Sequence, residues 1–167
     1  MPKVVTPPNL AALVAQISSD YPHLEVVEGN QFAWHAQKQR LAYRTTGRDT
    51  IKDIFSLLHE LGHAVLDHID YTYDIELLQL EVAAWEKARE LSVRYATELD
   101  EDHIQDCLDT YRDWLHLRAT CPTCFARSFQ TSASSYRCFN CQTEWSVTRS
   151  RLCRPYRLKT NQVTYTP

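Results

Sequence analysis

Two pairs of cysteines constrain the fold of the C-terminal part of this chain more than any other feature. Cys121 and Cys124 form one Cys-x-x-Cys pair, and Cys138 and Cys141 form a second. Four thiolates with this spacing make the closed tetrahedral ligand set of a structural zinc ion, and a reducing compartment disfavours disulfides. The surrounding residues form only short strand-like stretches with little apolar core. The spacing therefore predicts a zinc ribbon that depends on its metal for stability.

A second group of metal-binding residue types is the pentapeptide HELGH at residues 59–63, inside an amphipathic segment. Residues four apart on a helix differ by about 40° around its axis, so His59 and His63 point the same way. The two histidines can therefore bind one cation, and Glu60, turned by about 100° from His59, can approach a water on that metal. This is the H-E-x-x-H pattern of zinc metallopeptidases. The alternative is two solvent-facing histidines on a structural helix.

A catalytic zinc ion normally has three protein ligands and one open position, so a third ligand is needed. On a continuous helix His68 would be turned about 180° away from His59, which predicts a surface residue or one that supports the ligands. Glu81 is the better candidate, because it lies in the apolar stripe of the next helical segment. A carboxylate facing the core needs a compensating charge, which zinc would supply. An arginine partner is the alternative for Glu81.

Apolar periodicity predicts an α+β fold. Helices are expected at about 10–17, 50–69 and 74–99, with a further helix after Asp100. Three short stretches rich in β-branched and aromatic residues between the first two helices predict two or three antiparallel strands. Thr50 and Asp53 have the spacing of a variant capping box. Gly62 would permit another element to approach the HELGH helix closely.

The composition changes near residue 118, where the charge balance also reverses. Residues 118–167 contain eight basic side chains and one acidic one, whereas the chain as a whole has 18 basic and 21 acidic residues. We therefore expect three parts: a domain at 1–118, the zinc ribbon at 119–149 and a basic tail at 150–167. Packing of the basic part against the acidic domain is one explanation of this asymmetry.

Nucleic acid is a second candidate partner of residues 118–167. Basic side chains at 149–159 could contact phosphates, and the neighbouring aromatic residues could stack on bases. The aromatic candidates are Tyr136, Phe139, Trp145 and Tyr156. A solvated tail or a clamp on the acidic helices would also explain the charges.

The segments SLLHELGHAVLDH and EVAAWEKA together resemble the ImmA/IrrE family of bacterial and phage zinc metallopeptidases. The resemblance covers about residues 10–100 and includes the order of helix, strands, H-E-x-x-H helix and ligand-bearing helix. It implies a zincin-like metallopeptidase domain in which His59, His63 and Glu81 bind zinc and Glu60 is the catalytic base. Family members commonly cleave a repressor or related regulator. The cysteine-rich C-terminus and the lack of a recognisable helix-turn-helix depart from the family.

The expected function is therefore zinc-dependent endopeptidase cleavage of a regulatory or partner protein, with one catalytic and one structural Zn²⁺. SprT-like peptidases, which act on DNA-associated protein, also combine H-E-x-x-H with a zinc ribbon. This chain lacks their later His-Gly pair. A non-enzymatic binding module, with metal sites that only support the fold, is the third alternative.

The expected mechanism is metal-assisted peptide hydrolysis, in which Glu60 takes a proton from water and delivers it to the leaving amine. An edge strand at about 40–45 could hold an extended substrate by β-addition. The candidates for stabilising the oxyanion, among which the sequence does not decide, are Tyr43, Tyr71, Tyr73, His68 and His103.

A cytoplasmic location without membrane contact is expected from two absences in the sequence. No run of 18 apolar residues predicts a transmembrane helix, and the segment MPKVVTPPNL has no long apolar stretch of the signal-peptide kind.

Overall fold

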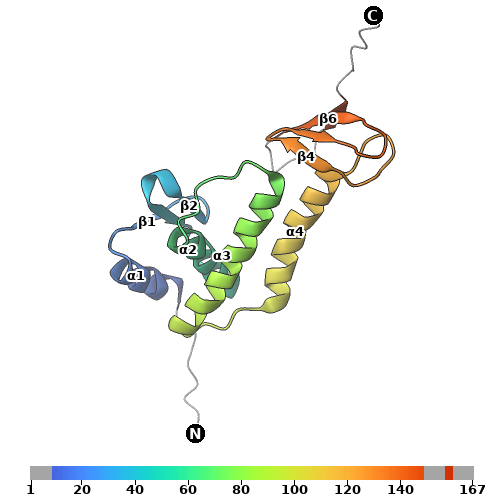
Figure 1. Ribbon diagram of the computed structural model, residues 1–167. Helices are drawn as coiled ribbons and strands as arrows, with labels where there is room; N and C mark the ends of the chain where they lie inside the picture. Colours follow the sequence, from blue (N-terminus) through green and yellow to red (C-terminus); the bar gives the residue numbers. More distant parts are fainter. Residues whose placement is uncertain (1–8, 149–156, 160–167) are drawn as a thin grey trace, which may run out of the picture. The chain divides into compact units, whose positions relative to one another are not determined.

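The computed structural model describes residues 9–148 and 157–159, which form two compact units (Figure 1). The first unit takes the chain up to Asp70 together with Gln79–Gln105, and the second takes Tyr71–Leu78 and the chain from Asp106 onward. Within the described residues the architecture is α+β, as predicted. Most of the predicted tail at 150–167 lies outside the described residues, which include only Arg157–Lys159 of it.

Helix α1, Leu10–Asp20, opens the first unit. Its N-cap is Asn9, whose side-chain oxygen accepts a hydrogen bond of 2.8 Å from the backbone N–H of Ala12. This bond satisfies one of the N–H groups that a helix leaves without a partner at its start. Leu13 and Ile17 are fully buried, so the predicted apolar face of this helix faces the core.

A three-stranded sheet follows, with β1 at Glu25–Glu28, β2 at Ala33–His35 and β3 at Arg40–Tyr43. The strand order is β1-β3-β2; β3 is parallel to β1 and antiparallel to β2. The prediction of a purely antiparallel sheet was therefore wrong. The chain reverses twice, first after β1 and again through the 3₁₀ turn Ala36–Lys38, so β3 runs in the direction of β1 and inserts beside it.

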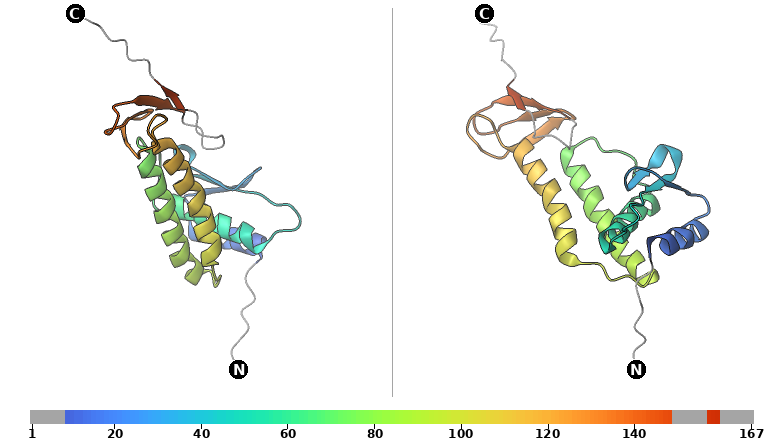
Figure 2. Two further views of the ribbon diagram at one scale, coloured as in Figure 1. Left: turned by 90° about the vertical axis from the view of Figure 1, so that its right-hand side faces the viewer. Right: turned by 180° about the vertical axis from the view of Figure 1, so that it is seen from behind.

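The same strand order corrects the predicted substrate edge at 40–45. Strand β3 has a neighbour on each side, so its backbone groups are already engaged in the sheet. Strands β1 and β2 are the edges. Helix α2 contacts β2 and β3, and α1 contacts β1, which places both helices against this sheet (Figure 2).

Helix α2, Ile51–Val65, carries the HELGH segment. The predicted capping box is present, because the Asp53 carboxylate accepts a bond of 2.7 Å from the Thr50 backbone N–H. The helix ends four residues before the predicted limit of 69. Asp67 has a φ of 52°, a left-handed conformation that stops a helix, and Ile69 is exposed. The sequence signalled no stop because the apolar residues continue past Val65.

Helices α3, Asp74–Arg94, and α4, Glu101–Ala119, each contribute residues to both units. Helix α3 ends five residues before its predicted limit at 99, and α4 starts where expected. In the first unit α3 crosses α2 at Gly62, as the sequence suggested. A Cβ on Gly62 would lie 2.4 Å from the carbonyl oxygen of Ala84, so only glycine permits this approach.

The second unit contains an antiparallel sheet in the order β4-β5-β6-β7. Its strands are Phe129–Ser132, Ser135–Arg137, Glu144–Val147 and Arg157–Lys159. Its core cluster includes the parallel rings of Tyr136 and Trp145, 5.5 Å apart, together with Cys121, Cys138 and Val147. This core is small.

A buried ionic group links helices and sheet inside the second unit. The Arg118 guanidinium donates two hydrogen bonds to Asp74, at 2.6 and 3.1 Å, and the Tyr136 hydroxyl donates a third at 2.6 Å. All three residues are at most 2% exposed. Because a lone buried charge is costly, each of these groups depends on the others.

No helix in the part of the chain that the structure describes combines the length and the apolar character that crossing a membrane requires.

Candidate metal centres

His59, His63 and Glu81 converge from α2 and α3 in the first unit. His59 Nε2 lies 3.1 Å from Glu81 Oε2, and His63 Nε2 lies 3.6 Å from the same oxygen. The two histidine Nε2 atoms are 3.2 Å apart. The three residues proposed from sequence as ligands of one ion therefore present three donor atoms to a common point.

These distances match the ligand spacing of zinc. Tetrahedral ligands at about 2.0–2.1 Å from an ion lie about 3.3–3.4 Å from one another. Two histidine nitrogens and one carboxylate oxygen are also a donor set that zinc accepts, and they leave a fourth position open. The residues present therefore fit a zinc ion. The one-turn spacing of His59 and His63 on α2 explains why the two imidazoles point to the same place.

Glu81 is 4% exposed, and its charge is held by the histidines. Burial by itself raises the pKa of the Glu81 carboxyl, but hydrogen bonds to His59 and His63 outweigh burial and keep the pKa well below its ordinary value. The carboxylate is thus ionised at neutral pH, as a metal ligand must be. His59 Nδ1 has no hydrogen-bond partner among the described residues, although it is buried.

Glu60 is held in place by the edge strand β2. Its Oε2 accepts a hydrogen bond of 2.8 Å from the backbone N–H of Trp34. The indole N–H of the same tryptophan donates a bond of 2.9 Å to the backbone carbonyl of His68. Trp34 therefore links the proposed base to the segment after α2. Sequence reasoning missed this residue, because its only signal was a tryptophan in a short strand.

His68 lies beside the metal-ligand group, although the sequence placed it on the far side of a longer helix. Because α2 ends at Val65, the chain turns back and the His68 backbone N–H bonds the carbonyl of His63 at 3.0 Å. The two Nδ1 atoms of His63 and His68 are then 2.9 Å apart. Of the two expectations for His68, a surface position or support of the ligands, the geometry favours support.

Aromatic rings pack behind the ligand group. The His59 ring stacks on Trp85 with centroids 4.3 Å apart, and His103 contacts Trp85 and Phe55. This packing restricts the orientation of His59, which aims its Nε2 at Glu81. His103 is thus part of the aromatic cluster. These contacts do not support the suggestion that His103 stabilises the oxyanion.

The four cysteines of the two pairs gather into a second group in the other unit. Cys121 Sγ lies 3.6 Å from Cys141 Sγ, and Cys124 Sγ lies 3.5 Å from Cys138 Sγ. All four ligand atoms lie within 4.8 Å of one another. Tetrahedral sulfurs at about 2.3 Å from zinc are separated by about 3.8 Å, so these four fit a closed structural site.

Local hydrogen bonds favour the thiolate form at part of this group. Hydrogen bonding with Ser128 and with the Cys141 backbone lowers the pKa of Cys138 to about 6. Hydrogen bonding with Thr143 also lowers the pKa of Cys141. A thiolate is the metal-binding form of cysteine, so both shifts favour metal binding by Cys138 and Cys141.

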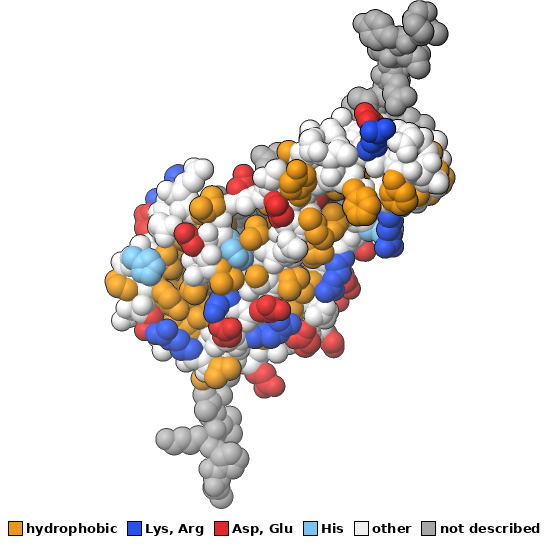
Figure 3. All heavy atoms as spheres, in the orientation of Figure 1, with side chains coloured by type: hydrophobic (Ala, Val, Ile, Leu, Met, Phe, Trp, Pro, Cys, Tyr) orange, Lys and Arg blue, Asp and Glu red, His pale blue; other side chains and the backbone are white. Residues whose placement is uncertain are grey.

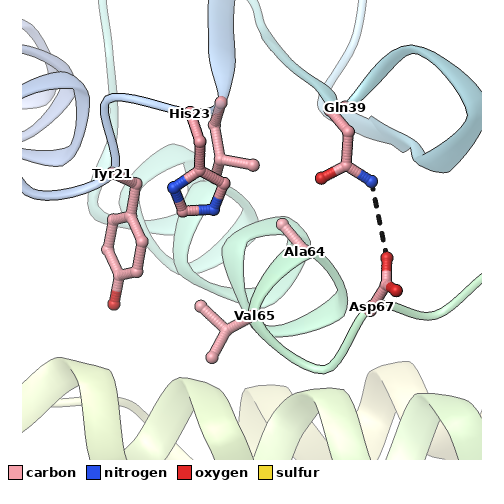
Figure 4. Close-up of a pocket in the computed structure, with 7 residues that line it drawn as sticks. Tyr21, His23, Gln39, Ala64, Val65 and Asp67 are labelled. Atoms are coloured by element: carbon pink, nitrogen blue, oxygen red, sulfur yellow. Dashed lines mark hydrogen bonds between the residues drawn. The ribbon is translucent and has the colours of Figure 1, made fainter.

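A cavity of about 490 Å³ lies beside the C-terminal end of α2 (Figure 4). Gln39 and Asp67 lie together on one side of it, joined by a side-chain hydrogen bond of 3.4 Å, and both have positive φ. Ala64 and Val65 of α2 line another wall. None of the three proposed metal ligands lines this cavity, so it is a separate recess.

No family model, curated protein or solved structure matches this chain. The structural basis for a function is therefore found in the chain's own residues. They provide two candidate metal centres, one open and one closed.

Proposed function

We propose that this protein is a zinc-dependent endopeptidase of the H-E-x-x-H type. One observation supports this above all others: His59, His63 and Glu81 converge from two helices on one point, with Glu60 next to the first ligand. Three protein ligands with one open position distinguish hydrolytic zinc from the closed four-ligand sites that only support a fold. The four-cysteine group of the second unit is a site of that closed kind.

Each residue of the proposed centre has a separate task. Zinc, when bound, polarises the scissile carbonyl and increases the acidity of water. Glu60 accepts the proton of the attacking water and later delivers it to the leaving amine. The Trp34 N–H holds the Glu60 carboxylate on the side of β2, and His68 supports His63. Glu81 balances the cation inside an otherwise apolar region.

The substrate class that fits this geometry is an extended polypeptide segment. Strand β2 is an edge of its sheet and bonds Glu60 through Trp34, so it is the edge nearest the proposed base. An extended chain can add to a sheet edge through its backbone, independently of its side chains. This role replaces the one expected for residues 40–45.

The resemblance to the ImmA/IrrE family supports the same reaction and adds a substrate class. It covers the HELGH segment and the helix that carries Glu81, and it implies cleavage of a regulatory protein such as a transcriptional repressor. The zinc ribbon at 119–149 departs from the family and is a candidate site of substrate recruitment.

The decisive experiment compares the wild-type chain with Glu60→Gln on a mixed peptide library, with cleavage read by mass spectrometry. Loss of the general base should slow cleavage by about 10²–10⁴-fold. Zinc content should remain that of wild type, because Glu60 is not a ligand. Glu86→Gln, an exposed glutamate of α3, is the matched control and should leave cleavage unchanged. Cleavage by Glu60→Gln at the wild-type rate would refute the proposal.

A further inference from the structure

Three phenylalanines are exposed on the zinc-ribbon module of the second unit. Phe125 and Phe129 are each 76% exposed and Phe139 is 63% exposed. Hydrophobic side chains are visible on the surface of this module in Figure 3. Single exposed apolar residues are common on protein surfaces, so only those of the three that lie together can indicate an interaction site.

The structure changes which aromatic residues could bind a partner. Tyr136 and Trp145, both named from the sequence, are 2% and 0% exposed and belong to the core. Phe139 is exposed, and the rings of Phe129 and Phe139 lie 6.0 Å apart with an interplanar angle of 35°. Tyr156 lies outside the described residues. The exposed neighbouring pair is therefore Phe129 and Phe139. Phe139 was named from the sequence, but Phe129 was not.

A basic side chain lies on the same face as this pair. Phe129 pairs with Arg137 across β4 and β5, and Arg137 pairs with Glu144 across β5 and β6. Directly paired residues of antiparallel strands point to the same side of a sheet. The Arg137 side chain is 53% exposed and lies 3.7 Å from Glu144. A largely exposed guanidinium thus lies beside Phe129, its cross-strand partner.

The chemistry of this face fits single-stranded nucleic acid better than a protein partner. Aromatic rings stack on unpaired bases, and a neighbouring arginine contacts phosphate or stacks itself. Residues 118–167 carry eight basic side chains and one acidic one; Arg118 is buried against Asp74, and the remaining basic excess complements a polyanion. Strands β4, β5 and β6 also carry the polar residues Gln130, Thr131, Ser132, Ser135 and Ser146, so the face is no continuous apolar groove.

We propose that Phe129, Phe139 and Arg137 form a surface that binds single-stranded nucleic acid by base stacking and phosphate contact. This surface lies entirely within the second unit and involves none of the proposed catalytic residues. The inference therefore goes beyond the peptidase proposal and does not depend on it.

The test uses the full-length, zinc-loaded chain and a fluorescent oligothymidine of about 20 nucleotides, longer than the site sizes of small binding modules. Fluorescence anisotropy should show binding that weakens steeply as salt increases. A duplex of the same length should bind more weakly, because its bases are already stacked. Phe129→Ala combined with Phe139→Ala should weaken single-strand binding by about tenfold or more.

Two further pairs of variants identify the physical cause. Tyrosine at both positions keeps an aromatic face and should preserve binding, whereas leucine keeps the apolar surface without a ring and should lose it. Arg137→Gln should reduce the slope of log affinity against log salt by about one. Glu144→Gln, its cross-strand neighbour, should strengthen binding by removing a negative charge.

Zinc content and circular dichroism of every variant check that the module remains folded. Absence of salt-dependent single-strand binding by the wild-type chain would overturn the inference. Leucine variants that bind the oligonucleotide as well as wild type would also overturn it, because they would show that binding does not depend on stacking of aromatic rings on bases.

Discussion

At the scale of single residues, His68 supports the proposed metal ligand His63 through one hydrogen bond between their side chains. A histidine that binds metal through Nε2 must carry its proton on Nδ1, so His63 donates through Nδ1 to its partner at 2.9 Å. His68 Nδ1 is then the acceptor. Such outer hydrogen bonds fix the orientation of a metal-binding ring and increase its basicity.

His68→Leu should therefore weaken zinc binding at the centre of the first unit by about 10–100-fold. His68→Asn should retain near wild-type affinity, because its side-chain oxygen can occupy the place of Nδ1. A competition titration against a chromophoric chelator measures both affinities. Equal affinities of the Leu variant and wild type would show that the bond contributes nothing to the site.

At the scale of elements, the crossing of α2 over α3 determines whether the three ligands meet. His59 and His63 come from α2 and Glu81 from α3, and the two helices approach at Gly62 and Ala84. The distance between the histidines and the carboxylate therefore depends on a residue that binds nothing itself.

Gly62→Ala should destabilise the protein by about 1–3 kcal/mol, because the new methyl group forces the helices apart. In an exposed helix interior the same change would normally stabilise by about 1 kcal/mol. Zinc affinity should also fall, since Glu81 moves away from the histidines. Urea denaturation and metal titration measure the two effects. Gly29→Ala is the control, because its Cβ would meet the Ala42 Cβ at 3.6 Å and the Gln31 carbonyl oxygen at 4.0 Å, both ordinary contacts.

The N-terminal cap of α2 gives a pH-dependent prediction. Burial raises the pKa of Asp53, but hydrogen bonds from Thr50 and the nearby charge of Arg44 bring the pKa below its ordinary value. The folded state thus binds this proton less readily than the unfolded state does. The stabilisation is present above the ordinary aspartate pKa of about 3.9 and is lost as the pH falls through the lowered value.

Asp53→Ala should accordingly lose about 1 kcal/mol of stability at pH 7. The difference in unfolding free energy between variant and wild type should decrease at pH values below about 4. Denaturation curves of both proteins across this range provide the measurement, with exposed Asp49→Asn as the control. A difference in unfolding free energy that stays constant down to the lowest pH would show that the charge of Asp53 does not stabilise the start of the helix.

At the scale of the whole molecule, the two candidate metal centres belong to different units. The histidine and glutamate group lies in the first unit, and the four cysteines lie in the second. Every ligand of a given centre comes from within one unit. We therefore expect the two ions to bind independently, each stabilising its own part of the chain.

Metal analysis of two variants tests this independence. Cys121→Ser and Glu81→Ala should each reduce the zinc content from about two ions per chain to about one, because each removes a ligand from a single centre. Cobalt substitution should show a thiolate charge-transfer band in Glu81→Ala but not in Cys121→Ser. Loss of both ions from either variant would mean that the centres are coupled.

The sequence by itself determined the local geometry of both centres. The i and i+4 spacing of His59 and His63 fixes their common direction once a helix forms, and a Cys-x-x-Cys pair likewise brings two sulfurs together in one turn. The choice of Glu81 also came from local pattern, because a carboxylate in an apolar stripe requires a partner. The α+β class and the approximate helices followed from the same periodicities.

Only the tertiary structure decided what depends on chain reversals and on side-chain burial. The parallel pairing of β1 with β3, the return of His68 to His63 and the bond from Trp34 to Glu60 join residues whose contact no spacing rule predicts. Burial also depends on the tertiary structure: Trp145 lies in the core and Phe129 on the surface, although both are aromatic residues of short strands. Local patterns specify directions within one element, whereas contacts between elements depend on the packing of the folded chain.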